Sequence, residues 1–231
     1  LTAIGLGADL LVHYGHSCLV PMDPANGLKV LYVFVDIQID AQHLIENLKL
    51  NFTKAERLSL VSTIQFITTL QVVANKLLEI GYSVTIPQSK PLSPGEILGC
   101  TAPTLNNVDV VIYLGDGRFH IEAAMIANPK LKAYKYDPYD KSFTKEYYDH
   151  NDMRQQRKQC IAKAKYAKTF GIIMGTLGRQ GNPKVVEHLQ KRLECSNKNV
   201  IIYLFSEVYP AKLDLLVGID AFVQVACPRL S

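Results

Sequence analysis

The stretch Asp109–His120, which reads DVVIYLGDGRFH, decides the fold expected for this chain. Five apolar residues follow Asp109 without alternation, and the chain then breaks at Gly115-Asp116-Gly117. Such a run is typical of a strand buried on both faces, as in a parallel sheet covered by helices. Glycines at the carboxyl end of a strand let the backbone turn sharply and approach a ligand closely. We therefore expect a buried parallel strand that ends in a ligand-binding turn.

The same strand-and-turn unit occurs twice more. Asp9 begins DLLVHYGH and Asp220 begins DAFVQVAC, and both aspartates align with Asp109. The residues at the tips of the three aligned units are His16, Asp116 and Cys227. Three copies that each deliver a polar or sulfur side chain indicate three related lobes whose tips face a common centre.

Strands alternate with helical patterns along the chain, which predicts an α/β fold with parallel sheets flanked by helices. Together with the repeats, this predicts three lobes in a pseudo-threefold arrangement around a central cavity. The expected division is residues 1–25 as the C-terminal piece of a first lobe, 26–168 as the second lobe with a connecting helix, and 169–231 as a truncated third lobe.

Helices are expected where apolar residues recur at helical spacing, or behind a capping residue. Asp40 is the expected N-cap of a helix over 41–51, and Asn182 followed by Pro183 is expected to start a helix in the third lobe. Further helices are predicted for 66–80, 120–127 and 146–168. The tyrosine-rich stretch 132–143, KAYKYDPYDKSF, is expected to be a connector.

The composition is that of an ordinary globular protein, with 48% hydrophobic and 20% charged residues. A formal net charge of +4 is too small to indicate direct binding of nucleic acid. No apolar run approaches the ~20 residues that a membrane-spanning helix needs. Five cysteines without a visible secretory signal favour a reduced, intracellular setting and metal ligation over disulfides. Leu1 is not an initiator, so we expect the chain to be clipped at both ends.

Two cysteines are candidate ligands of an iron–sulfur cluster. Cys100 follows Gly99 and Cys227 follows Ala226, so little side-chain bulk stands beside either thiol. Thiolate ligands of such clusters can come from distant parts of a fold. The alternative is two ordinary buried cysteines, because no C-x₂-C pair supports ligation. The other cysteines are expected to be inert or structural: Cys18, Cys160 and Cys195.

Two turns are candidate anion sites. Gly178, Arg179 and Gln180 lie between an apolar strand and a helix that starts with proline, where free N–H groups and an arginine suit a carboxylate or phosphate. The alternative is a tight turn with a surface arginine. The GDGRFH turn offers Arg118 and His120 in the same way. The GDGRFH turn matches neither a Rossmann fingerprint nor a P-loop, which argues against nucleotide binding by those routes.

Several motifs together resemble the diphthamide-synthesis family, and the resemblance covers nearly the whole chain. They are HYGHSCLVP (13–21), LYVFVD (31–36), KPLSPGEILGCT (90–101), YLGDGRFHIE (113–122), LGRQGNP (177–183) and QVACPRLS (224–231). The resemblance implies three α/β lobes that each give one cysteine to a [4Fe-4S] cluster. Cys100 would be the ligand from the second lobe and Cys227 the ligand from the third, while the first-lobe cysteine would lie upstream of Leu1.

The activity implied by the resemblance is a radical reaction of S-adenosylmethionine. An electron from the cluster would break the bond between sulfur and Cγ, and the 3-amino-3-carboxypropyl radical would add to an imidazole carbon of a histidine in translation elongation factor 2. The chain has no C-x₃-C-x₂-C motif of ordinary radical enzymes of this type. The residues expected to hold S-adenosylmethionine are Asp116, Arg118, His120, Gly178, Arg179 and Gln180.

The resemblance also implies partners and a location. These are a second diphthamide-synthase subunit in a heterodimer, an electron-donor protein and elongation factor 2, all in the cytoplasm, with no membrane. One alternative is a dehydratase similar to quinolinate synthase, which also resembles a three-lobed protein with one cluster cysteine per lobe. The other is a supporting subunit without chemistry of its own, against which the presence of both Cys100 and Cys227 argues.

Overall fold

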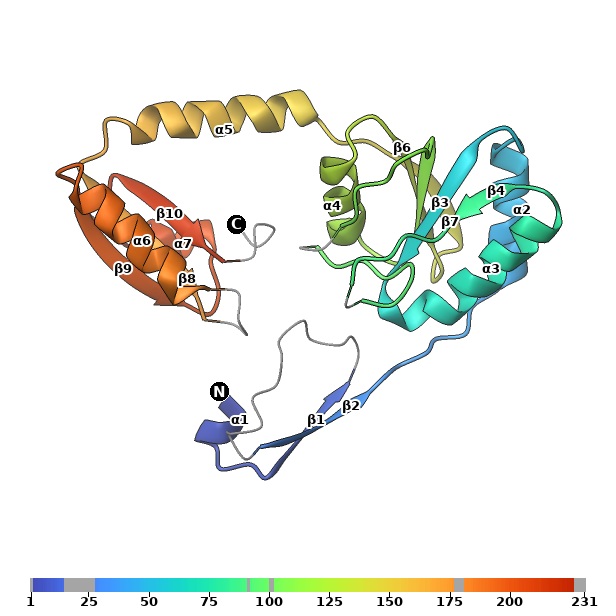
Figure 1. Ribbon diagram of the computed structural model, residues 1–231, viewed down its shortest axis with the longest axis horizontal. Helices are drawn as coiled ribbons and strands as arrows, with labels where there is room; N and C mark the ends of the chain where they lie inside the picture. The colour runs from blue at the N-terminus through green and yellow to red at the C-terminus, as the bar shows by residue number, and fades with distance from the viewer. Residues whose placement is uncertain (1, 15–27, 91, 100–101, 177–180, 227–231) are drawn as a thin grey trace. The chain divides into compact units, whose positions relative to one another are not determined.

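The computed structural model describes residues 2–14, 28–90, 92–99, 102–176 and 181–226 (Figure 1). The chain divides into two compact units, Leu1–Tyr148 and Asp149–Ser231. Sheets in both units are built from parallel strands with helices between them, which confirms the predicted α/β class.

The larger unit contains a five-stranded sheet in the order β4-β3-β5-β6-β7. The central strand β5 is buried at every position, as its unbroken apolar run predicts. The pairs β3–β4, β3–β5 and β5–β6 are parallel, and only the edge strand β7 is antiparallel. The strand bounds are β3 Arg57–Ser62, β4 Ser83–Thr85, β5 Val110–Leu114, β6 Lys132–Asp137 and β7 Ser142–Glu146.

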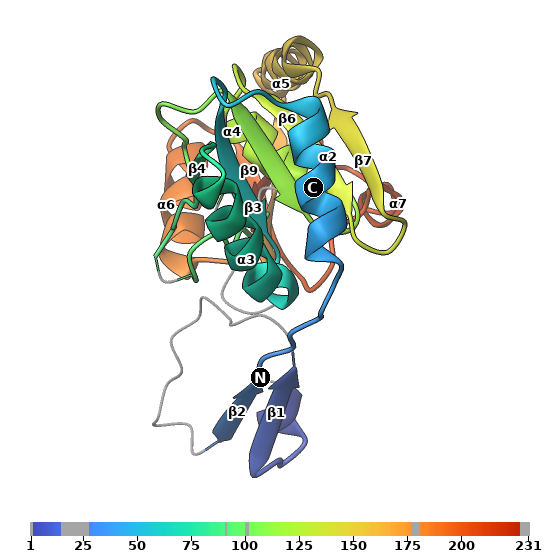
Figure 2. The same cartoon turned by 90° about the vertical axis from the view of Figure 1, so that its right-hand side faces the viewer.

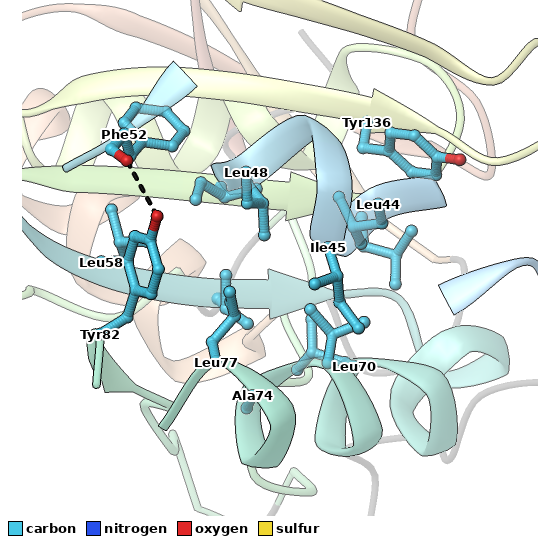
Figure 3. Packing of buried hydrophobic residues seen from close by; sticks show 14 of the residues in the cluster. Leu44, Ile45, Leu48, Phe52, Leu58, Leu70, Ala74, Leu77, Tyr82 and Tyr136 are labelled. Carbon is cyan, nitrogen blue, oxygen red and sulfur yellow. Dashed lines mark hydrogen bonds between the residues drawn. The ribbon is translucent and has the colours of Figure 1, made fainter. Parts of the chain in front are cut away.

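Helices cover both faces of this sheet. On one face, α2 (Ala41–Asn51) and α3 (Ile67–Glu79), preceded by the 3₁₀ turn η2 (Ile64–Phe66), pack against alternate residues of β3 and β5 (Figures 2 and 3). On the other face, α4 (Phe119–Ala127) packs against the intervening residues.

The predicted start of α2 is confirmed. The Asp40 carboxylate accepts a hydrogen bond from the backbone N–H of His43 at 3.1 Å, as an N-cap should. The end of α2 is also fastened, because the Tyr82 hydroxyl donates to the carbonyl of Phe52 at 3.1 Å (Figure 3).

The prediction of a connector at 132–143 is wrong, because this stretch forms β6, a tight turn and β7. Charged residues interrupt the apolar pattern of this stretch, so the sequence pattern did not predict a strand. Tyr134 and Tyr136 alternate with Lys135 and Asp137, and both rings pack into the α2–α3 core while the charged pair faces the α4 side. The parallel pairing with β5 and the burial of these rings make the stretch a strand.

A separate pair of parallel strands, β1 (Leu10–Tyr14) and β2 (Lys29–Val33), follows the short helix α1 (Thr2–Gly5). The smaller unit has a parallel sheet in the order β10-β8-β9. Its elements are α5 His150–Ala164, β8 Thr169–Gly175, α6 Pro183–Glu194, β9 Asn199–Phe205, α7 Pro210–Leu213 and β10 Ala221–Val225. The predicted cap of α6 is confirmed, since the Asn182 side chain accepts from the Lys184 N–H at 3.0 Å.

The three aspartate-led strands β1, β5 and β10 lie in three different sheets. Asp109 and Asp220 make equivalent contacts at the foot of their strands. The Asp109 carboxylate accepts from the Arg57 N–H at 3.0 Å, and the Asp220 carboxylate accepts from the Thr169 N–H at 2.9 Å. Arg57 and Thr169 are the first residues of the neighbouring strands, so β4-β3-β5 corresponds to β9-β8-β10.

Asp9, the residue before β1, resembles Asp109 in a different contact, which its backbone makes. Its backbone carbonyl accepts from Lys29 at 3.3 Å, as the carbonyl of Asp109 accepts from Lys132 at 3.2 Å, so β1–β2 corresponds to β5–β6. The sequence repeat is therefore a repeat of strand pairing. The threefold arrangement, the central cavity and the lobe boundaries at 25 and 168 stay predictions.

Candidate functional site

The candidate site lies at the carboxyl ends of β3, β5 and β6. Ligands of open parallel sheets bind at this edge, where loops and turns leave the strands. The chain places Ser62 at the end of β3, the turn Gly115–Arg118 and the start of α4 after β5, and Asp137 at the end of β6. The loop 92–99 leads along the same edge toward Cys100.

The turn after β5 requires glycine for two reasons. Gly115 has φ +155°, and its N–H donates to the carbonyl of Tyr136 on β6 at 3.0 Å. A Cβ atom at Gly115 would lie 2.6 Å from the hydroxyl oxygen of Tyr113, which is fully buried. Gly117 has φ +62° but open space around it, so only its backbone conformation favours glycine.

Tyr113 links the two ends of this turn. Its hydroxyl donates to the carbonyl of Asp116 at 3.2 Å, and its oxygen lies 3.4 Å from Nδ1 of His120. Because a carbonyl only accepts, all three groups are satisfied when Nδ1–H of His120 donates to the tyrosine oxygen. Burial raises the pKa of the Tyr113 hydroxyl, and the negative charge of Asp116 raises that pKa further. The hydroxyl therefore stays protonated at neutral pH and remains a donor.

Arg118 is held by three partners. Its Nη1 lies 3.0 Å from Oε2 of Glu146, its Nε donates to Glu122 at 3.3 Å, and its Nη2 donates to the carbonyl of Tyr147 at 3.0 Å. The side chain of Glu146 is 8% exposed and that of Arg118 is 52% exposed, so a buried carboxylate pairs with a half-exposed arginine. These bonds tie the start of α4 to the end of β7.

The Asp116 side chain is exposed, as is that of Arg118, but Asp116 differs from Arg118 in its contacts. Its carboxylate has no hydrogen bond or ion pair within the part of the chain that the structure describes. The turn therefore presents one carboxylate to its surroundings.

The loop before Cys100 is fastened to the end of β3. The Ser62 N–H donates to the carbonyl of Gly95 at 2.8 Å, and the Ser62 carbonyl accepts from Ile97 at 2.9 Å. Gly99 then lies so close to Phe119 that a Cβ atom would overlap the aromatic ring. Cys100 is the next residue in the sequence, and it lies outside the described residues.

The structure does not test the roles of five of the predicted site residues. Cys100, Cys227 and the segment 177–180, with Gly178, Arg179 and Gln180, lie outside the described residues, as does the tip residue His16. Within the described ranges no group of three or more His, Cys, Asp or Glu side chains is placed to hold a metal ion. Convergence of the two cysteines therefore stays a prediction.

Sequence reasoning missed two contributors to the described part of the site. Tyr113 belongs to an apolar run, but a buried tyrosine hydroxyl needs a partner, and this need is a signal for a polar neighbour. Glu146 carried no signal, because it reaches Arg118 only through the hairpin of β6 and β7.

The architecture and this edge define an α/β protein that gathers its candidate ligand-binding groups at the carboxyl ends of parallel strands. All of residues 1–231 match the model of a protein family described as "Putative diphthamide synthesis protein". The chain therefore belongs to the diphthamide-synthesis family.

Relatives and solved structures agree with this assignment. The chain is 60% identical over 230 residues to 2-(3-amino-3-carboxypropyl)histidine synthase subunit 1 of Nematostella vectensis, covering 100% of this chain and 49% of the relative. The same-named human protein is 58% identical over 232 residues, covering 100% and 53%. The chain thus spans about half the length of these relatives. A crystal structure of Dph2 from Pyrococcus horikoshii with a 4Fe-4S cluster has a TM-score of 0.77 at 28% identity, covering 99% of this chain and 67% of that one.

Proposed function

We propose that the protein containing this chain transfers the 3-amino-3-carboxypropyl group of S-adenosylmethionine to an imidazole carbon of a histidine in translation elongation factor 2. This is the first step of diphthamide biosynthesis. The observation that carries the proposal is the set of relatives, 52–60% identical to this chain, that are named 2-(3-amino-3-carboxypropyl)histidine synthase subunit 1. Their names favour group transfer over the dehydration expected of a protein similar to quinolinate synthase.

We propose that Cys100 and Cys227 are two ligands of one [4Fe-4S] cluster. The Pyrococcus horikoshii relative is described with such a cluster, and thiolates are the ligands that iron–sulfur clusters take. The close approach of Gly99 to Phe119 supports the fit, because it brings the backbone before Cys100 to the site edge without a side chain in between. When bound, the cluster supplies the electron that cleaves the bond between sulfur and Cγ of S-adenosylmethionine.

The protein residues would bind and orient the cosubstrate. Either Arg118 or Arg179 could take the carboxylate of S-adenosylmethionine on sequence grounds. Arg118 already shares its charge between Glu122 and Glu146, which favours Arg179 for this role. Arg179 and Gln180 precede the N-terminus of α6, where free N–H groups stabilise an anion. Arg118 then serves to position the turn. Asp116 and His120 would bind groups of S-adenosylmethionine other than its carboxylate.

The partners follow from the proposed reaction. The name "subunit 1" of the relatives supports a complex with a second diphthamide-synthase subunit. An electron-donor protein and elongation factor 2 complete the set, and this substrate places the reaction in the cytoplasm. No helix among the described residues is long and apolar enough to cross a membrane.

The test is cluster content in full-length protein purified anaerobically. We expect Cys100→Ala and Cys227→Ala each to lower the iron and sulfide content and to remove the Mössbauer signal of a [4Fe-4S] cluster. Cys160→Ala and Cys195→Ala are matched controls, because both cysteines are exposed, Cys160 on α5 and Cys195 at the C-cap of α6. Wild-type cluster content in both the Cys100 and the Cys227 variant would contradict the ligand assignment and favour a supporting subunit.

A further inference from the structure

In the turn after β5, the Asp116 carboxylate is available to accept a hydrogen bond from a ligand, whereas the Arg118 guanidinium is already bound by protein groups. The Asp116 carboxylate is exposed and has no partner within the described part of the chain. The guanidinium of Arg118, two residues further on, is bound by two carboxylates and one carbonyl. Arg118 with Glu122 and Glu146 carries a net charge of minus one, so this neighbourhood repels an anion and attracts a cation.

Two hydrogen bonds to residues of the sheet hold the backbone at Asp116. The buried Tyr113 hydroxyl donates to its carbonyl at 3.2 Å, and the Gly115 N–H is held by the carbonyl of Tyr136 at 3.0 Å. With both sides of the turn bonded to the sheet, the Asp116 side chain is presented from a defined backbone. A backbone held in this way loses little further freedom when a ligand binds, so only the Asp116 side chain has to be ordered.

We propose that Asp116 binds the α-ammonium group of the amino acid end of S-adenosylmethionine and that Tyr113 is the positioning residue that holds Asp116 in place. The inference deepens the proposed function and rests on it. Of the polar groups on the methionine portion, the carboxylate needs donors, whereas the ammonium needs an acceptor, and the Asp116 carboxylate is an acceptor. The second-lobe edge thus selects the amino group.

The test uses equilibrium binding to full-length protein with a reconstituted cluster. Three ligands are compared: S-adenosylmethionine, its analogue without the amino group, and decarboxylated S-adenosylmethionine. We expect Asp116→Asn to weaken binding of the two ligands with an ammonium by about 10- to 100-fold and to leave the desamino analogue unchanged. Asp140→Asn, which changes another exposed aspartate in the turn between β6 and β7, should alter none of the three affinities.

Three outcomes would overturn the proposal. Equal loss of affinity for all three ligands would mean a general structural effect, and unchanged binding of S-adenosylmethionine would mean no contact. If cluster-loaded wild-type protein fails to bind S-adenosylmethionine, the proposed function fails first and this inference with it.

The positioning role of Tyr113 has a separate readout. Tyr113→Phe removes the hydroxyl but keeps the buried ring, so we expect normal cluster content and a smaller loss, about 3- to 10-fold, confined to the ligands with an ammonium. Loss of affinity for the desamino analogue to the same extent would show a role in folding of the edge and refute the positioning role.

Discussion

Replacing Gly115 by alanine tests the geometry of the turn at the end of β5. The new Cβ would stand 2.6 Å from the Tyr113 hydroxyl oxygen and 2.7 Å from Cζ of the same ring. Tyr113 is fully buried between β5 and α4, so its ring has no space into which to move. Either the ring or the backbone of the turn must therefore shift.

The magnitude has two parts. A side chain at positive φ costs roughly 1–2 kcal/mol, and an extra methyl group forced into a packed site costs about 1–3 kcal/mol. Gly115→Ala should therefore reduce the free energy of unfolding by roughly 2–5 kcal/mol. Gly117→Ala is the matched control, because it shares the positive φ but nothing lies within 4 Å of the new Cβ, so it should cost only the first part.

The assay is urea unfolding followed by circular dichroism, with the two variants compared under the same conditions. The difference between their unfolding free energies isolates the contact with Tyr113, since both substitutions change the unfolded chain alike. Equal destabilisation by Gly115→Ala and Gly117→Ala would refute the tight packing of the turn against Tyr113.

Two further predictions concern the repeat and the third lobe. Hydrogen bonds from the side chain and backbone of Arg57 hold the pKa of the Asp109 carboxyl well below its usual range, so its contribution to stability is complete above the unfolded pKa near 4 and is lost as the pH falls below it. Asp109→Asn should therefore lower the urea midpoint of unfolding at pH 7, and the difference in midpoint between wild type and variant should be smaller at pH 3. An equal difference at both pH values would contradict the pairing of Asp109 with Arg57. Asn182→Ala should cost about 1 kcal/mol because α6 loses its N-cap, whereas Asn182→Asp should retain most of the stability, and equal unfolding free energies for wild type and Asn182→Ala would rule out the cap.

Local patterns predicted the parts of the fold that depend on local physics. The apolar run after Asp109 and the cap at Asp40 each identify an element without knowledge of the rest of the chain, and both predictions are confirmed. The alignment of Asp109 with Asp220 also predicted equivalent strands. Each carboxylate accepts a hydrogen bond from the backbone N–H of the first residue of the neighbouring strand.

The remainder depended on contacts between distant residues. β6 is a strand because it pairs with β5, and its charged residues interrupt the apolar pattern that would have predicted a strand. Glu146 lies 28 positions after Arg118, and only the β6–β7 hairpin brings the two together. Arg118 was therefore predicted to be a ligand-binding cation, whereas its contacts favour a positioning role. The roles of Cys100 and Cys227 come from the family resemblance and stay predictions.

The measurement that tests the account most directly is transfer of a labelled carbon. Full-length protein with its partner subunit, a reductant and elongation factor 2 is incubated anaerobically with S-adenosylmethionine labelled either in the carboxyl carbon or in the methyl carbon. We predict that the carboxyl label appears on one histidine of elongation factor 2, that the methyl label does not, and that Cys100→Ala abolishes the transfer. Absence of carboxyl label from cluster-loaded wild-type protein, or transfer of the methyl label instead, would contradict the proposed reaction.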